Sequence, residues 1–63
     1  MRPQPYQEIE RSLKSVGFVL DRSSGSHFIW RNEATGKSVP VPHHRKPLSV
    51  GTVLAIYRQA GLR

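Results

Sequence analysis

Residues 6–20 read YQEIERSLKSVGFVL, and this stretch contains the change of hydrophobic period that decides the fold. Its first part has apolar residues at positions that form one stripe along an α-helix, namely Tyr6, Ile9, Leu13 and Val16. Gly17 can adopt the left-handed conformation in which helices commonly end. The bulky and β-branched residues 18–20 that follow are typical of a short strand. The stretch therefore predicts a helix that stops at Gly17 and leads directly into a strand.

The next segments predict a second strand that pairs with the first. The first strand is expected to end near Asp21-Arg22, and the small polar residues Ser23-Ser24-Gly25 suit a hairpin connection. Residues 26–31 form another extended run, in which alternation places Phe28 and Trp30 on one face. We expect Trp30 in the core because it shares that face with Phe28. The opposite face then carries His27, Ile29 and Arg31.

A third strand and a second helix complete the chain. Residues 37–41 are typical of a strand, and Pro40 cannot donate a ladder hydrogen bond. Pro40 therefore belongs on a sheet edge or has its nitrogen facing solvent. Ser49 is suited to cap a helix that ends at Gly61, with Leu62 folding back over its end. The apolar residues assigned to the buried side of this helix are Val50, Val53, Leu54, Tyr57 and Ala60.

The order of elements predicts an α+β fold, α-β-β-β-α, formed as a single domain over residues 1–63. Hairpin-length connections favour a three-stranded antiparallel sheet. Two amphipathic helices need one apolar sheet face to bury against, so both are expected on the same side of the sheet. The other face of the sheet is then left open.

Composition excludes several classes of function. A chain of 63 residues is too short for two catalytic lobes or a separate cofactor domain. It has no cysteine, no HExxH motif and few carboxylates, so we expect no metal and no other cofactor. The longest nearly apolar run, residues 16–20, is far short of a signal-peptide core or a membrane span. The expectation is a cytoplasmic protein that does not associate with membranes.

The basic charge points to a polyanionic partner. Ten Lys and Arg residues against four Asp and Glu residues give a net charge of +6. Within residues 22–46 the basic residues are opposed only by Glu33, and all three histidines lie there. This region would form much of the open sheet face, where phosphate contacts and base stacking can hold RNA. An ordinary solvated face is the alternative. The residues selected as RNA contacts are Arg22, Ser26, Arg31, Lys37, His43, Arg45 and Lys46.

His27 is the candidate catalytic residue. It stands at the start of the second strand and alternates away from Phe28 and Trp30, so its side chain is expected on the open face. An imidazole has an ordinary pKa of about 6.5 and can accept and return a proton near neutral pH. It could remove the proton from an RNA 2′-hydroxyl, whose oxygen then attacks the adjacent phosphorus. From the residues alone, an ordinary exposed histidine is the favoured interpretation.

His43 and His44 could donate to a phosphate or protonate the leaving oxygen. Adjacent side chains in a strand-like loop point in opposite directions, so only one of the two is expected to face the His27 surface.

Four segments occur in an order that spans nearly the whole chain. They are Gly17-Phe18, Gly25-Ser26-His27, Val39-Pro40-Val41-Pro42 with His44, and Gly51-Thr52 leading through Ile56 to Arg58-Gln59-Ala60-Gly61-Leu62. Together they resemble the HicA family of small bacterial toxins, which are mRNA interferases. The resemblance implies a fold like that of a double-stranded-RNA-binding domain, in agreement with the order of elements predicted above.

The resemblance also implies a mechanism and a partner. It implies metal-independent cleavage of single-stranded mRNA by the histidine of the Gly-Ser-His segment, here His27. His44 matches the histidine that family members often carry after the third strand, and it is a candidate helper. A HicB-type antitoxin is expected to mask the His27 surface, so that the toxin is a monomer when free and part of a hetero-oligomer when neutralised.

Two other functions stay open at this stage. The same fold could serve as an RNA-binding module without catalysis, although the turn at Ser49-Val50-Gly51-Thr52 lacks the lysine cluster usual in duplex-RNA binders. Alternatively, the basic face could meet only an acidic protein. Cleavage of RNA separates the first of these from a toxin ribonuclease, and binding of RNA at low salt separates the second.

Overall fold

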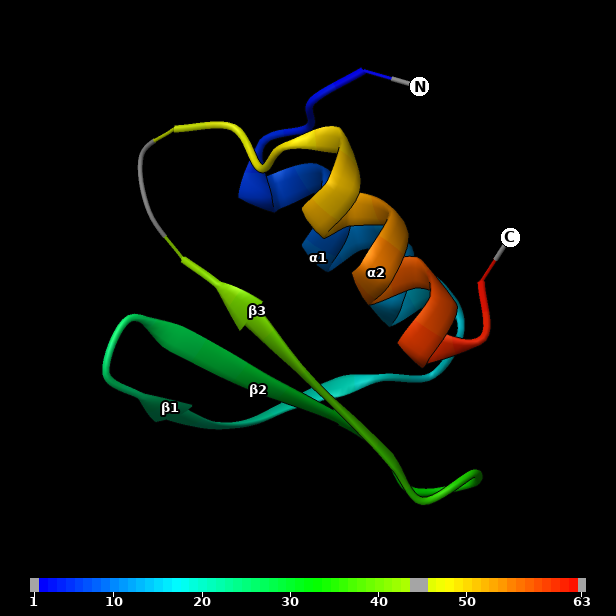
Figure 1. Ribbon diagram of the computed structural model, residues 1–63. Coiled ribbons are helices and arrows are strands. Elements are labelled where there is room, and N and C mark those ends of the chain that lie inside the picture. Colours follow the sequence, from blue (N-terminus) through cyan, green and yellow to red (C-terminus); the bar gives the residue numbers. More distant parts are fainter. Residues whose placement is uncertain (1, 44–45, 63) are drawn as a thin grey trace.

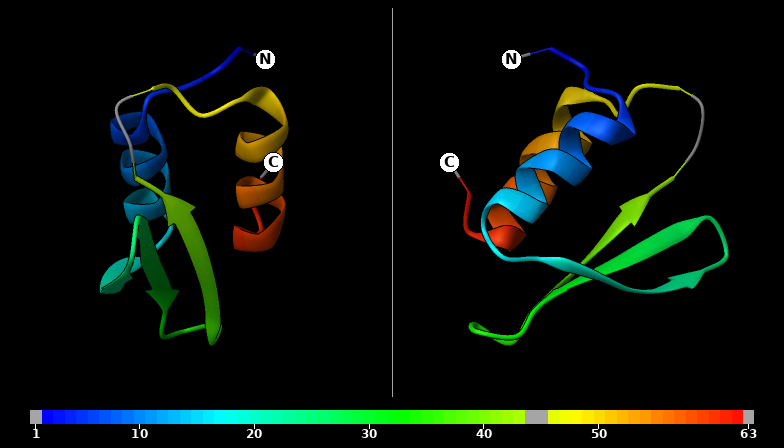
Figure 2. Two further views of the ribbon diagram at one scale, coloured as in Figure 1. Left: turned by 60° about the vertical axis from the view of Figure 1, so that its left-hand side comes forward. Right: turned by 180° about the vertical axis from the view of Figure 1, so that it is seen from behind.

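Two helices lie on one side of a three-stranded antiparallel sheet (Figures 1 and 2). The computed structural model describes residues 2–43 and 46–62. The sheet has the strand order β1-β2-β3, with β2 in the centre. This arrangement confirms the predicted α+β fold, which is like that of a double-stranded-RNA-binding domain. In chain order, the elements are α1 (Tyr6–Ser15), β1 (Val19–Ser24), β2 (His27–Asn32), β3 (Lys37–Pro42) and α2 (Val50–Ala60).

α1 ends in a hydrogen-bonded motif that directs the chain into the sheet. Gly17 has a φ of 96°, a left-handed conformation that costs glycine little. The Phe18 N–H donates to the Leu13 carbonyl oxygen at 3.0 Å, and the Gly17 N–H donates to that of Lys14 at 3.1 Å. This is the Schellman pattern, which satisfies carbonyls that a helix end leaves unpaired. Leu13 and Phe18 are both buried, so the end of the helix is also fixed by apolar packing.

The β1–β2 connection is tighter than the sequence predicted. Ser23 and Ser24 belong to β1, and only Gly25 and Ser26 form the turn. Gly25 has a φ of 60°, and glycine at the first central position suits a two-residue hairpin because the turn then matches the twist of the strands. All six β1 residues are exposed, so polar serines can extend this edge strand. As a result, His27 becomes the first residue of β2.

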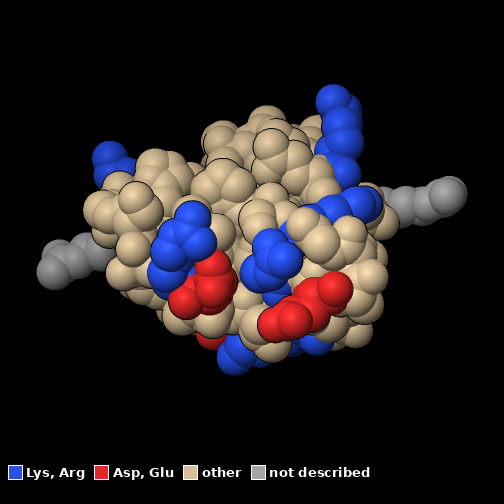
Figure 3. Space-filling model, turned by 90° about the horizontal axis from the view of Figure 1, so that it is seen from below, with Lys and Arg blue, Asp and Glu red and all other residues tan. Residues whose placement is uncertain are grey.

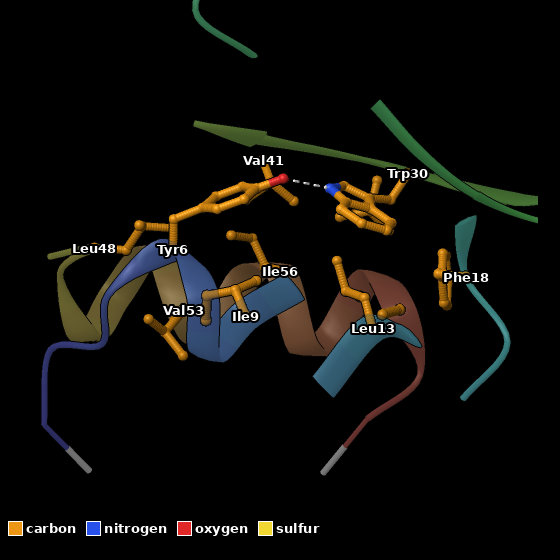
Figure 4. Close-up of a cluster of buried hydrophobic side chains, with 11 residues drawn as sticks. Tyr6, Ile9, Leu13, Phe18, Trp30, Val41, Leu48, Val53 and Ile56 are labelled. Atoms are coloured by element: carbon orange, nitrogen blue, oxygen red, sulfur yellow. Dashed lines mark hydrogen bonds between the residues drawn. The ribbon is translucent and has the colours of Figure 1, made fainter. Parts of the chain in front are cut away.

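The core lies between the helices and the inner face of β2 and β3. Trp30 is buried, as predicted, and its indole Nε1–H donates to the Tyr6 hydroxyl oxygen at 3.1 Å (Figure 4). Burial raises the pKa of the Tyr6 hydroxyl above its usual value, although the Trp30 hydrogen bond acts in the opposite direction. The other buried apolar residues are Ile9, Leu13, Phe18, Val39, Val41, Leu48, Val53, Ile56 and Ala60.

The second half of the chain follows the sequence prediction closely. β3 extends to Pro42 and is an edge strand, which leaves the missing N–H of Pro40 without consequence for the sheet. The Ser49 hydroxyl accepts a hydrogen bond from the Thr52 N–H at 3.3 Å and caps α2. At the other end, Gly61 has a φ of 82° and the Leu62 N–H donates to the Tyr57 carbonyl oxygen at 2.8 Å.

Three helix positions differ from the predicted apolar stripes. Val16 is 41% exposed because α1 has already ended at Ser15. On α2, Leu54 is 45% exposed, so its assignment to the core was wrong. Ile56 is buried in its place, since the side of α2 that meets β3 follows Val53, Ile56 and Ala60.

Asn32, the last residue of β2, is a buried polar residue. Its amide Nδ2 donates to the Val16 carbonyl oxygen at 2.9 Å. Its Oδ1 accepts from the N–H groups of Ala34 and Thr35 at 3.0 and 3.3 Å. One side chain thus links the end of α1 to the β2–β3 turn.

Within residues 2–43 and 46–62, no helix is long and apolar enough to cross a membrane.

Candidate functional site

The open face of the sheet carries three rows of side chains. Residues that pair directly across antiparallel strands project from the same face, so the register defines each row. The row beside the β1–β2 hairpin consists of Ser24, His27 and Pro42. The middle row consists of Arg22, Ile29 and Pro40. The far row consists of Val19, Arg31 and Ser38.

His27 stands in the centre of the first row and is exposed. Ser24 is its partner on β1 and Pro42 is its partner on β3. Neither neighbour carries a charge or a large side chain, so the imidazole is accessible from the open side of the sheet. The Gly25-Ser26 turn immediately before it fixes where β2 begins. This position agrees with the sequence prediction and leaves the ring free to meet a ligand.

A β-bulge brings Arg22 onto the same face as His27. Leu20 pairs with Trp30, whereas Arg22 pairs with Ile29, and the register shifts between them at Asp21. Without the bulge, Leu20 and Arg22 would lie on the same face because they are two residues apart. With it, Arg22 joins the open face. Simple alternation along the sequence cannot reveal this change.

The charge on the open face is basic but not continuous. The Arg22 Nη1 lies 2.7 Å from the Asp21 Oδ2 in an exposed ion pair, and exposed pairs of this kind contribute little to stability. The Arg31 Nη1 donates to the Ser38 hydroxyl oxygen at 3.5 Å. Figure 3 looks at the sheet side of the molecule and shows acidic side chains beside the basic ones. A polyanion bound here would therefore compete with Asp21 for the Arg22 guanidinium.

His43 lies toward the other face of the sheet. Its ring stacks on Phe28 with a centroid distance of 4.4 Å and an interplanar angle of 6°. It also meets Tyr6 edge-on, with centroids 4.5 Å apart. Because Phe28 shares the inner face of β2 with buried Trp30, the imidazoles of His27 and His43 occupy opposite sides of the sheet.

The remaining predicted contacts that the structure describes, Ser26, Lys37 and Lys46, lie in different parts of the fold. Ser26 lies in the adjacent turn, where its carbonyl oxygen accepts a hydrogen bond from the His43 N–H at 2.8 Å. Lys37 pairs with Asn32 at the opposite end of β2, and its ammonium group lies near Gly61 at the end of α2. Lys46 is exposed beyond β3. His44 and Arg45 lie outside the described residues.

A family model identifies the chain. The model described as the HicA toxin of bacterial toxin-antitoxin matches residues 6–62, nearly the full length. The chain belongs to the HicA toxin family. No curated protein matches it. Membership agrees with the resemblance carried by the Gly25-Ser26-His27 segment, and it establishes a toxin of a toxin–antitoxin system with an antitoxin as its partner.

The described part of this HicA toxin contains no group of three or more His, Asp or Glu residues that could hold a metal ion. His27 has Ser24 and Pro42 as its direct neighbours across the sheet, and neither supplies a carboxylate or imidazole ligand. Among the described residues in the three rows, the ionisable side chains on the open face are those of His27, Arg22 and Arg31.

Two features of the HicA toxin site were missed from the sequence. The bulge at Asp21 is one, and the aromatic contacts of His43 are the other. The sequence did contain a signal for the place of His43, because His43 continues the series Val39 and Val41 at a spacing of two residues. That spacing places it on the inner side with the core of β3.

Proposed function

We propose that this HicA-family toxin is a metal-independent endoribonuclease that cleaves single-stranded mRNA, with His27 as its general base. The observation that carries the proposal is the place of His27 on the open face of the sheet, accessible and on the same face as Arg22 and Arg31. Membership of a toxin family supports a chemical activity that harms the cell. RNA is the polyanion that brings its own nucleophile.

The reaction needs no metal because the 2′-hydroxyl of RNA is next to the scissile phosphorus. His27 takes the proton from this hydroxyl, and the oxygen forms a bond to phosphorus. The bond from phosphorus to the 5′ oxygen of the next nucleotide then breaks, and that oxygen takes up a proton. The products are a 2′,3′-cyclic phosphate and a 5′-hydroxyl, so atoms and charges balance without a co-reactant.

Among the described residues, Arg22 is the cation best placed to stabilise the charge that develops on the phosphate. Arg22 belongs to the row next to that of His27, which is a separation of about 7 Å along the strands. It lies on β1, and neighbouring strands are about 5 Å apart. Arg31 lies four residues from His27, about 13 Å along β2. We assign Arg22 to the reacting phosphate and Arg31 to a neighbouring one, and Lys46 is a further proposed contact.

The second proton transfer requires a group that protonates the leaving oxygen. His44 is the proposed helper, from the family resemblance, and it lies outside the described residues. His43 does not suit this role, because its ring packs against Phe28 on the other side of the sheet.

A HicB-type antitoxin is proposed to neutralise the toxin by covering the His27 face. The net charge of +6 favours an antitoxin with an acidic surface, which would also be attracted from a distance. The free toxin would be a monomer in the cytoplasm, where mRNA is available, and the neutralised form a hetero-oligomer. A partner that binds only the folded toxin also stabilises it.

The test is cleavage of an RNA whose reactive hydroxyl has been removed. The protein is incubated in EDTA with an unstructured RNA, and one cleaved bond is mapped. A second RNA carries a 2′-deoxynucleotide on the 5′ side of that bond only. We expect loss of this cut and retention of the others. Cleavage at the deoxy position, or inhibition by EDTA, would contradict the mechanism, and tight binding without any cleavage would indicate an RNA-binding module.

A further inference from the structure

Three aromatic rings gather at the end of the sheet where His27 stands. Tyr6 comes from the start of α1, Phe28 from β2 and His43 from the residue after β3. The rings of Phe28 and His43 are parallel, with centroids 4.4 Å apart. Tyr6 is perpendicular to both, with centroid distances of 5.6 Å to Phe28 and 4.5 Å to His43. These offset and edge-on geometries are those that aromatic rings prefer.

The stack runs from the core toward solvent. Tyr6 is buried, Phe28 is half-buried and His43 is exposed. Phe28 covers one face of the His43 imidazole. Since Phe28 occupies one face of the imidazole, the face on which a further ring could stack is the opposite one.

Tyr6 does not cover that outer face. A ring stacked on the far side of His43 would be separated from Phe28 by His43 itself, and its centroid would lie much farther from Phe28 than 5.6 Å. The three distances instead place Tyr6 beside the pair. Among residues 2–43 and 46–62, no other ring stacks on His43.

The backbone fixes the stack beside the His27 hairpin. The His43 N–H donates to the Ser26 carbonyl oxygen at 2.8 Å, which extends the β2–β3 ladder by one residue. Pro42 pairs with His27 itself. The exposed imidazoles are therefore at the same end of the sheet, one on each side, and a strand of RNA that crosses this end passes from one to the other.

We propose that the outer face of His43 is a stacking platform for a nucleobase of the RNA, from a nucleotide adjoining the phosphate at His27. Phe28 and Tyr6 hold the imidazole in place, so little conformational freedom is lost when a base stacks on it. Stacking accepts any base because every base has a flat π-face. The inference rests on the proposed ribonuclease function and assigns His43 to base contact rather than to phosphate contact or proton transfer.

Binding can be measured apart from cleavage in a His27→Ala background. A short RNA carries the fluorescent base 2-aminopurine at successive positions, and affinity is followed by fluorescence anisotropy. Base stacking on an aromatic side chain contributes about 1–3 kcal/mol per base, so His43→Ala should weaken binding by about five- to 150-fold. His43→Phe should restore the affinity, since phenylalanine keeps the flat ring but cannot donate to a phosphate.

The position of the stacked base supplies a second readout that does not depend on a variant being stable. In the otherwise unaltered His27→Ala protein, 2-aminopurine should be quenched at one position next to the scissile bond. His43→Ala should remove this quenching and His43→Phe should keep it. A thermal melt of each variant shows whether it is folded.

The outcomes separate the two proposals. The stacking platform is wrong if His43→Ala binds RNA as tightly as its parent, or if His43→Phe loses as much affinity as His43→Ala does. In either case, cleavage of RNA by the protein with His27 intact would still support the ribonuclease function. If the protein with His27 intact neither binds nor cleaves RNA, the ribonuclease function is wrong and the platform with it.

Discussion

The Trp30 indole and the Tyr6 hydroxyl form a buried hydrogen bond of 3.1 Å between the central strand and α1 (Figure 4). Tyr6 also contacts Phe28 and His43, so this ring connects the core to the end of the sheet where His27 stands. Its anchoring is therefore relevant both to stability and to the geometry of the site.

Tyr6→Phe should destabilise the fold by about 1–3 kcal/mol, because the buried Trp30 N–H would lose its acceptor. The measurement is the urea midpoint followed by Trp fluorescence. Tyr57→Phe is the matched control. The Tyr57 hydroxyl donates to the Gln4 Oε1 at 3.0 Å, but Tyr57 is only half-buried. Water can therefore take the place of the lost hydroxyl, and the loss of stability should be smaller than in Tyr6→Phe. Equal losses of stability in the two variants would show that the buried Trp30–Tyr6 hydrogen bond contributes no more than the half-buried Tyr57–Gln4 bond.

The free energy of unfolding should decrease as the pH rises above about 10, because of the ionisation of Tyr6. Its pKa is raised from 10.0 in the folded protein, chiefly by burial. Below pH 10 the phenol is neutral in both the folded and unfolded states, and its contribution is fully present. Above pH 10 the unfolded chain ionises first, so the free energy of unfolding decreases until the folded pKa is reached. Thermal melts from pH 8 to 11.5 should show a steeper fall for the unaltered protein than for Tyr6→Phe.

Gly25 and Gly51 form a matched pair of glycine positions. A Cβ at either would meet no atom within 4 Å, but Gly25 has a φ of 60° whereas Gly51 lies in α2. Gly25→Ala should therefore cost about 1–2 kcal/mol from backbone strain alone. Gly51→Ala should stabilise by about 0.5–1 kcal/mol, since alanine favours the helix. Chemical denaturation of both variants tests this, and destabilisation by both would mean that contacts rather than backbone conformation decide.

Arg22 and Arg31 should have different effects on the proposed reaction. Arg22→Ala should lower the rate at saturating RNA by about a hundredfold, as loss of a group that stabilises transition-state charge does. Arg31→Ala should mainly weaken binding and reduce the slope of log affinity against log salt by about 0.7. Arg11→Ala, on the exposed side of α1, is the control and should change neither quantity. Loss of rate from Arg31→Ala with none from Arg22→Ala would reverse the assignment.

Local patterns predicted the elements well because their causes are local. The helical stripe through Ile9 and Leu13, the stop at Gly17 and the cap at Ser49 each depend on a few neighbouring residues. The inner place of Trp30 followed from the period of two in β2. The period of two predicted the face on which His27 lies but not a catalytic role for it. That role was suggested by the family resemblance, and the exposure of His27 on the open face supports it.

The features that were missed depend on partners far away in the sequence. Leu54 and Ile56 fit similar helical patterns, and only the position of β3 against α2 decides which of them is buried. The burial of Asn32 depends on a hydrogen bond from its amide to the carbonyl oxygen of Val16, a residue far away in the sequence. The bulge at Asp21 arises from the pairing of β1 with β2, and it alone determines that Arg22 shares a face with His27.

The most direct test of the account is the cleavage rate of purified His27→Ala and His27→Gln proteins in EDTA, beside Arg11→Ala. His27 is exposed, so its replacement should leave the thermal melt of the fold nearly unchanged. Loss of a general base predicts that both His27 variants cleave at least about a hundredfold more slowly, with RNA affinity largely kept, while Arg11→Ala cleaves normally. A folded His27→Ala protein that cleaves RNA as fast as the unaltered toxin would contradict the central claim.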